Sequence, residues 1–120
     1  MPMIVAAPGL APAVCETPVD LLDLFPTLLT AAGVDPASDM QDRPGQSLFD
    51  IAAALPKRDR VIFSEYHAAG SNTAGFMLRK GRWKLHYYVR YAPELFDLES
   101  DPEELHDRAA DPSCTAALQD

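Results

Sequence analysis

The residues best suited to chemistry lie in a loop of small side chains, residues 67–75, which reads HAAGSNTAG. The imidazole of His67 can exchange a proton near neutral pH, and it can donate a hydrogen bond to an anionic oxygen. Ser71 and Asn72 add a hydroxyl and an amide, while the glycines and alanines between them leave room for a ligand. We therefore predict that His67, Asn72 and Ser71 bind substrate. The alternative for His67 is a hydrogen bond to the backbone of its own loop.

Two cysteines, Cys15 and Cys114, are the other residues with intrinsic reactivity. Neither belongs to a CxxC pair, so a structural zinc site is not expected, and we predict no metal ligands in the chain. A disulfide between the two is left open. Separate thiols in a reducing compartment fit the pattern better and favour the cytoplasm.

Basic side chains gather on one predicted hairpin, and we interpret them as a solvated sheet edge, where charge discourages pairing with another chain. His86 alternates with polar residues along the same strand and is assigned to solvated surface. The aromatic residues there have the period-two spacing that is typical of packing within a sheet rather than of a ligand platform. The basic residues are Arg79, Lys80, Arg82 and Lys84.

The composition fits a folded, acidic domain. The chain has 120 residues, 48% of them hydrophobic, and a net charge of −8. That is enough apolar sequence for a core. The excess of acidic residues argues against binding to nucleic acid or to anionic membrane surfaces, because such binding requires clustered Lys and Arg. No apolar run reaches the length of a membrane-spanning helix.

Alternation of apolar and polar residues predicts an antiparallel sheet in the second half of the chain, with Lys80 and Gly81 as a two-residue turn. On the third strand, Trp83, Leu85 and Tyr87 are expected to be buried and the opposite face solvated. The predicted strands are residues 61–66, 75–80, 82–90 and 94–98.

Helical spacing of leucines predicts a helix over residues 18–32, with Thr17 as its N-cap. Pro26 interrupts it, so we expect a kink there or a helix that begins at Asp23. The other predicted helices are residues 46–55, as a short helix or docked loop capped by Ser47, an acidic helix from Glu103, and one from Cys114. The fold class is therefore α+β, a four-stranded antiparallel sheet packed with helices.

A wholly apolar run at residues 3–6 predicts one more strand, of the kind that is buried on both faces of a parallel sheet. The chain supplies no parallel neighbour for it. We therefore expect this strand to belong to a larger sheet outside the chain.

Several motifs resemble the sulfatase family of the alkaline-phosphatase-like superfamily. They are RKGRWKL and APELFDLESDPEEL in the second half, and PMIVAAPG and VDLLDLFPTLL in the first. The form SEYHAAGS resembles the choline-sulfatase and phosphonate-monoester-hydrolase branch. The resemblance implies that residues 1–56 are the tail end of a sulfatase main domain and that residues 57–120 are its C-terminal antiparallel subdomain.

The same resemblance implies a catalytic apparatus that this chain lacks. Complete members use a divalent cation of the calcium type and a formylglycine made from Cys or Ser in a C/S-x-P-x-R motif. Cys15 precedes ETPV and Cys114 precedes TA, so neither fits. We therefore predict no catalytic residue, and a C-terminal fragment that is inactive alone.

Two alternatives follow from the resemblance. The chain could instead be a non-catalytic partner or binding module that completes a split enzyme, with the missing N-terminal half or a second copy as its partner. The substrate of the complete enzyme would be a small anionic ester. It would be either a sulfate ester or, as the alternative, a phosphonate or phosphate ester.

Overall fold

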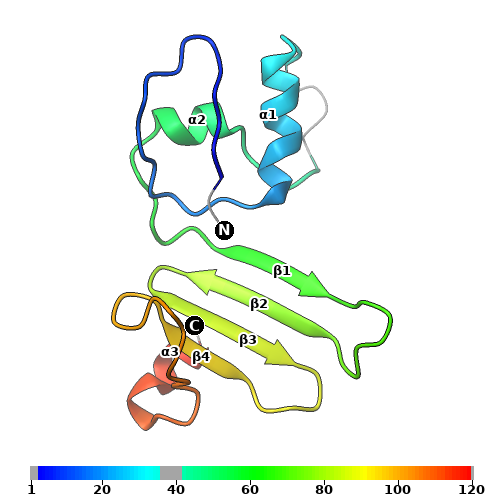
Figure 1. The fold of residues 1–120 in the computed structure, drawn as a ribbon, viewed down its shortest axis with the longest axis vertical. Helices are drawn as coiled ribbons and strands as arrows, with labels where there is room; N and C mark the ends of the chain where they lie inside the picture. The colour runs from blue at the N-terminus through cyan, green and yellow to red at the C-terminus, as the bar shows by residue number, and fades with distance from the viewer. Residues whose placement is uncertain (1–2, 36–41, 120) are drawn as a thin grey trace. The chain divides into compact units, whose positions relative to one another are not determined.

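The computed structural model describes residues 3–35 and 42–119. The chain divides into two compact units, Met1–Lys57 and Arg58–Asp120, and Figure 1 draws the elements of both. None of the described helices is long and apolar enough to cross a membrane.

The second unit is built on a four-stranded antiparallel sheet, as the sequence predicts. Its strands are paired in chain order, β1-β2-β3-β4, so each strand returns beside the one before it (Figure 1). Short connections between alternating strands produce this meander. The strands are β1 (Ile62–Tyr66), β2 (Gly75–Lys80), β3 (Trp83–Tyr88) and β4 (Glu94–Asp97).

The turn between β2 and β3 lies one residue later than predicted. Lys80 pairs with Trp83 in the sheet, so Gly81 and Arg82 form the connection. Gly81 has a φ of 56°, a conformation that costs glycine little because it has no Cβ. The hairpin prediction is confirmed, but its turn residues were wrong by one position.

The expected division of β3 into a buried and a solvated face is wrong. Lys84 and His86, placed on the solvated face, have side chains that are 21% and 25% exposed. Tyr87, placed on the buried face, is 48% exposed. Glu104, from the chain that follows β4, contacts both Lys84 and His86, so that segment covers the face expected to be wet. Because β2 and β3 are the inner strands, the basic residues do not form a sheet edge.

The acidic helix predicted from Glu103 does not form. Glu104 has a φ of 58°, which a right-handed helix cannot contain. The chain instead follows the free edge of β4, where Leu95 N donates to the Asp107 carboxylate at 2.9 Å and Arg108 N donates to Leu95 O at 2.7 Å. The helix predicted from Cys114 is confirmed as η3 (Pro112–Cys114) followed by α3 (Thr115–Gln119).

The first unit contains η1 (Leu21–Asp23), α1 (Leu24–Ala31) and α2 (Leu48–Ala53). The sequence allowed a kink at Pro26 or a helix that begins at Asp23, and the α-helix α1 begins one residue after Asp23, at Leu24. The 3₁₀ turn η1 precedes it, and Asp20 caps this turn, because its carboxylate accepts from Leu22 N at 2.9 Å. Thr17 was the wrong cap, since its hydroxyl accepts from Lys57 N at 3.0 Å. The short helix after Ser47 is confirmed, although the Ser47 side chain makes no cap hydrogen bond.

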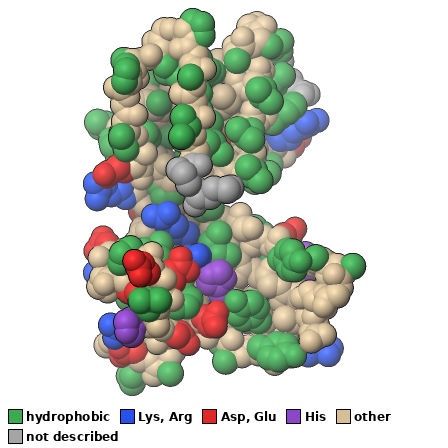
Figure 2. Space-filling model, in the orientation of Figure 1, with side chains coloured by type: hydrophobic (Ala, Val, Ile, Leu, Met, Phe, Trp, Pro, Cys, Tyr) green, Lys and Arg blue, Asp and Glu red, His purple; other side chains and the backbone are tan. Residues whose placement is uncertain are grey.

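Residues 3–6 form no strand with any described part of the chain. A strand needs a partner for its backbone groups, and the side chain of Ile4 is 90% exposed. Their place in a larger sheet stays a prediction. Hydrophobic side chains are exposed elsewhere on this unit too, as Figure 2 shows over much of its visible face.

Candidate functional site

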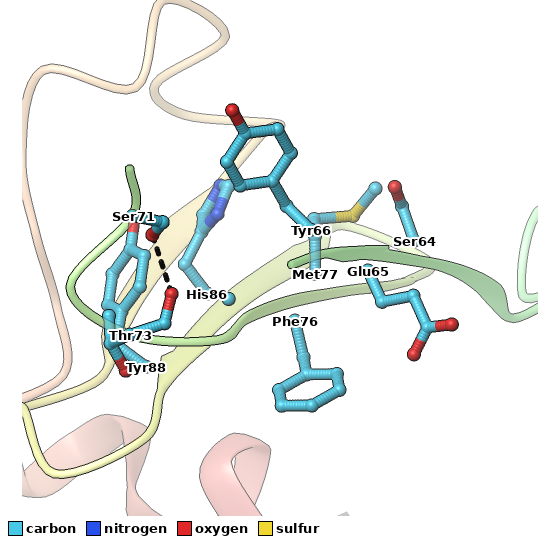
Figure 3. Close-up of a pocket in the computed structure, with 10 residues that line it drawn as sticks. Ser64, Glu65, Tyr66, Ser71, Thr73, Phe76, Met77, His86 and Tyr88 are labelled. Atoms are coloured by element: carbon cyan, nitrogen blue, oxygen red, sulfur yellow. Dashed lines mark hydrogen bonds between the residues drawn. The ribbon is translucent and has the colours of Figure 1, made fainter. Parts of the chain in front are cut away.

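A pocket of about 260 Å³ opens on one face of the sheet, where β1, β2 and β3 meet the loop between β1 and β2 (Figure 3). Strand register explains its position. Gly75 pairs with Tyr66 on one side and with Tyr88 on the other, so the three residues form one row across the sheet. Gly75 has no side chain, and the edge of the Tyr88 ring lies over it, with Tyr88 Cδ1 3.5 Å from the place that a Cβ would take. The lining residues are Ser64, Glu65, Tyr66, Ser71, Thr73, Gly75, Phe76, Met77, His86 and Tyr88.

His86 forms part of the pocket wall, which corrects its assignment to solvated surface. Its ring stacks against Tyr88 with centroids 6.2 Å apart and meets the edge of Phe96 at 6.1 Å. Its Nε2 lies 3.9 Å from the Glu104 carboxylate, which accepts from Lys84 Nζ at 2.6 Å. These neighbours together fix the orientation of the imidazole.

Tyr88 is held in place by its hydroxyl, which donates to the Glu94 carboxylate at 3.1 Å. Burial raises the pKa of the Tyr88 phenol, and the hydrogen bond to Glu94 and the charge of Glu94 raise it further. The phenol therefore stays neutral at physiological pH and acts as a hydrogen-bonding group rather than as a base.

His67 does not line this pocket. Its ring meets Phe76 edge-on, with centroids 5.3 Å apart, and Phe76 points to the opposite face of the sheet from Tyr66 and Met77 (Figure 3). The His67 Nε2 lies 3.3 Å from the carboxylate of Glu65, and both side chains are more than half exposed. Its partner is therefore a carboxylate and not the local backbone.

Ser71 does line the pocket, and its hydroxyl donates to Thr73 O at 2.6 Å. Thr73 in turn donates to Val89 O at 2.6 Å, which ties the loop to the chain after β3. Asn72 lies between them and is exposed. The structure thus separates His67 from Ser71, and substrate binding by His67, Ser71 and Asn72 stays a prediction.

Sequence reasoning did not find the pocket itself. His86 was assigned to solvated surface, and Tyr88 to packing within the sheet. The one local sequence signal for the pocket is the glycine at the start of β2. It indicates a pocket only when the residues that pair with it on the neighbouring strands are known.

The described residues offer no site for a divalent cation, since no group of three or more His, Cys, Asp or Glu side chains among them could hold one. Cys15 is exposed and Cys114 buried, and both are free thiols, so the disulfide left open does not form. The Cys15 thiol instead donates to Ile51 O at 3.8 Å, and the Cys114 sulfur lies 3.8 Å from the Ser113 hydroxyl.

Comparison with known proteins decides the family. The family described as "N-sulphoglucosamine sulphohydrolase, C-terminal" matches residues 1–120. The chain is a C-terminal sulfatase domain. Its family and its α+β fold are those that the sequence motifs implied.

Three relatives illustrate the similarity. The sulfatase domain is 35% identical to choline-sulfatase of Rhizobium meliloti (strain 1021) over 112 residues, which are 93% of this chain and 22% of that protein. It is 32% identical to arylsulfatase K of Bos taurus over an alignment of 134 positions, gaps included, which covers 98% of this chain and 24% of that protein. The solved structure of a 2-O GAG sulfatase matches 82% of this chain and 22% of its own, with 31% identity and a TM-score of 0.68. The domain therefore spans roughly a fifth to a quarter of the length of these relatives.

Proposed function

We propose that this domain serves a sulfuric ester hydrolase whose catalytic groups lie outside residues 1–120, and that the chain alone hydrolyses no sulfate ester. The observation that carries the proposal is the match of a C-terminal sulfatase family along the whole chain. Displacement at sulfur requires an activated nucleophile and cationic groups that neutralise the transferred oxygens. Neither cysteine lies in the formylglycine motif. In the complete enzyme, the calcium-type cation and the formylglycine would be held by the remaining sequence.

The domain would contribute to substrate binding. His67, Ser71 and Asn72 lie in or beside the β1–β2 loop, which presents exposed hydrogen-bonding groups from a rigid sheet. His67 is 53% exposed and is free to turn toward an ester oxygen. Before substrate binds, the hydrogen bond between His67 and Glu65 orients the imidazole.

The test is a chimera in which residues 1–120 replace the matching segment of the Rhizobium meliloti choline-sulfatase. We expect the chimera to cleave choline sulfate, and the isolated chain to release no product from 4-nitrophenyl sulfate with added calcium. Metal-dependent turnover by the isolated chain would overturn the proposal. So would a chimera that is folded and inactive.

Within an active chimera, His67→Ala should lower kcat/KM by about tenfold, the value of one hydrogen bond to a charged oxygen. His106→Ala is the matched control, because His106 is a second exposed histidine, 73% exposed and bonded to Asp101 in another loop. Equal activity of the two variants would remove His67 from the substrate site. Assays of the active chimera with a phosphonate monoester and a phosphate diester decide whether its substrate is a sulfate ester or an ester of phosphorus.

A second candidate function is that of a separate partner chain that completes a split enzyme. The exposed apolar side chains of the first unit favour it, since Ile4, Val14, Leu21 and Leu28 are each at least 66% exposed. Large apolar surfaces of this kind mark contacts with other protein. Mixing the chain with a choline-sulfatase that lacks the matching segment should then restore turnover. A self-associating chain that restores none would instead indicate a homo-oligomer.

A further inference from the structure

The chain that follows β4 takes the place of a fifth strand. The Asp107 carboxylate accepts from Leu95 N at 2.9 Å, and Arg108 N donates to Leu95 O at 2.7 Å. The carboxylate thus acts as the carbonyl of a neighbouring strand, and the amide acts as its N–H group. Residues 101–108, which we call the strap, therefore satisfy both backbone groups of Leu95.

The strap also closes the next position along this edge. Alternate residues of an antiparallel strand direct their backbone groups to the same side, so those of Asp97 face outward like those of Leu95. The Asp97 carbonyl accepts from Asp101 N at 2.8 Å. A sheet edge whose backbone groups are free is a template for a strand of another chain. The strap occupies these groups, and β4 is closed to such a strand.

We propose that the strap is an autoinhibitory contact, and that its release opens β4 to strand addition by β1 of a second copy of this chain. The chain stays a single copy with respect to this edge while the strap is closed. This device is independent of the proposed hydrolase function, because none of the residues proposed to bind substrate belongs to the strap or to β4.

The strap is held by one ion pair, between Glu104 and Lys84, which we call the latch. Lys84 Nζ donates to the two oxygens of the Glu104 carboxylate at 2.8 and 2.6 Å, and the Lys84 and Glu104 side chains are 21% and 31% exposed. Glu104 has a φ of 58°, a left-handed conformation that is strained for a residue with a Cβ. The latch therefore stabilises a backbone conformation that is unfavourable without it.

Little apolar contact supports the strap beyond the latch. Leu105 is 69% exposed, and the His106 side chain is 73% exposed. Asp107 and Arg108 are exposed as well, although both bond to β4. Segments with few buried apolar contacts open at a lower free energy than the core of a domain. The strap can therefore open while the sheet stays folded.

The strand β1 is the edge that fits an open β4. Among the residues that the structure describes, β1 pairs with β2 alone, so its outer side has no strand partner. Arg58 and Arg60 precede β1, whereas Glu94 begins β4 and Asp97 ends it. These opposite charges favour contact between β1 of one copy and β4 of another. Such pairing joins unlike edges and adds copies head to tail, so closing one of the two edges prevents it.

Amide hydrogen exchange of the full chain measures both steps. In wild type we expect slow exchange at Leu95 that is independent of chain concentration. Glu104→Gln removes the latch and should accelerate exchange at Leu95 by about tenfold at a concentration of about 10 µM, the effect of losing one hydrogen bond to a charged group. At about 1 mM the second copy should cover both edges, and protection should return at Leu95 and appear in β1. Leu85, in the inner strand β3, should exchange slowly throughout and report an intact sheet.

Two further variants locate the effect. Asp107→Ala removes the acceptor of Leu95 N without changing the latch, and it should give the same dependence on concentration as Glu104→Gln. Glu103→Gln is the matched control, because Glu103 is an exposed glutamate of the strap, and it should behave as wild type.

Exchange at Leu95 that stays slow in Glu104→Gln and in Asp107→Ala would overturn the proposal. So would fast exchange that a higher chain concentration does not slow, or protection of Leu95 without protection of β1. Association of the variants that leaves Leu95 exchanging fast would place the contact elsewhere on the chain and would overturn the proposal as well.

Discussion

Arg82 and Asp97 join the β2–β3 turn to the end of β4 through two parallel hydrogen bonds. Arg82 Nε donates to Asp97 Oδ1 at 2.7 Å, and Nη2 donates to Oδ2. The same carboxylate accepts from Ser100 Oγ at 2.7 Å and from Glu99 N at 3.2 Å, and Asp97 is 7% exposed. One side chain therefore holds a turn, a strand end and the chain that follows.

Asp97→Asn should destabilise the second unit, because the amide cannot accept all four of these bonds and removes the buried anion beside Arg82, which keeps only the exposed carboxylate of Glu99. We expect the midpoint of thermal unfolding to fall by about 5 to 10 °C. The fluorescence of Trp83, the one tryptophan of the chain, reports the transition. Glu99→Gln is the control, since Glu99 is 68% exposed and lies 3.4 Å from Arg82, and it should change the midpoint by less than about 2 °C. Equal midpoints for the two variants would show that the Asp97 pair contributes nothing.

The same pair predicts the response of stability to acid. The hydrogen bond from Arg82 holds the pKa of the Asp97 carboxyl well below its usual range in the folded chain, although burial opposes the shift. Between the folded and unfolded pKa values the unfolded chain binds more protons, so this contribution is complete above about pH 4 and is lost as the pH falls further. The free energy of unfolding of wild type should therefore decline more steeply below pH 4 than that of Asp97→Asn. Parallel declines would contradict the assignment.

Local patterns predicted the elements of this fold but not how they come together. Period-two alternation identified the two strands of the central hairpin, because it is a property of neighbouring residues. The pocket depends on which residues of β1, β2 and β3 are paired with one another. That register cannot be predicted from the alternation of residues within a single strand. His67 and Ser71 are four residues apart in sequence, yet they lie against opposite faces of the sheet.

Two of the wrong predictions have a common physical cause. The segment from Glu103 has the composition of a helix start, but its Asp107 carboxylate and its Arg108 amide bond to Leu95 at the free edge of β4 instead. The same segment brings Glu104 over Lys84 and His86. A tertiary contact thus overrode both a helix prediction and a surface prediction.

Thr27→Val should destabilise the first unit by about 2 kcal/mol, because it leaves a buried amide without its acceptor. The Thr27 hydroxyl donates to Asp23 O at 2.6 Å and accepts from Leu48 N at 2.8 Å. Urea unfolding followed by amide hydrogen exchange of Leu48 measures the loss. Thr27→Ser keeps both hydrogen bonds and should cost about 1 kcal/mol, the value of a buried methyl group. If the serine variant loses as much as the valine variant, the hydroxyl is not the stabilising group.

Ser47→Ala should leave the stability of the first unit unchanged or raise it by about 1 kcal/mol. Ser47 is 2% exposed, and its hydroxyl has no hydrogen-bond partner among the described residues. Removal of a buried polar atom that lacks a partner removes a desolvation penalty. Ser100→Ala is the comparison, since its hydroxyl donates to Asp97, and it should lower the free energy of unfolding by about 1 kcal/mol. A loss of stability in Ser47→Ala would show that this hydroxyl is hydrogen-bonded in solution.

Gly45→Ala should be the most destabilising small substitution in the first unit. Gly45 has a φ of +112°, and a Cβ there would lie 2.9 Å from the carbonyl carbon of Leu22 and closer still to its oxygen. The strained backbone and the clash with another backbone segment together should cost about 3 kcal/mol or more. Gly33→Ala is the control, because Gly33 has a φ of +74° and nothing within 4 Å of the added carbon, so it should cost about 1 kcal/mol from strain alone. Exchange of the Gln46 amide, which donates to the Asp23 carboxylate at 2.8 Å, reports the local opening. Equal exchange rates in the two variants would show that Gly45 does not pack closely against Leu22 in solution.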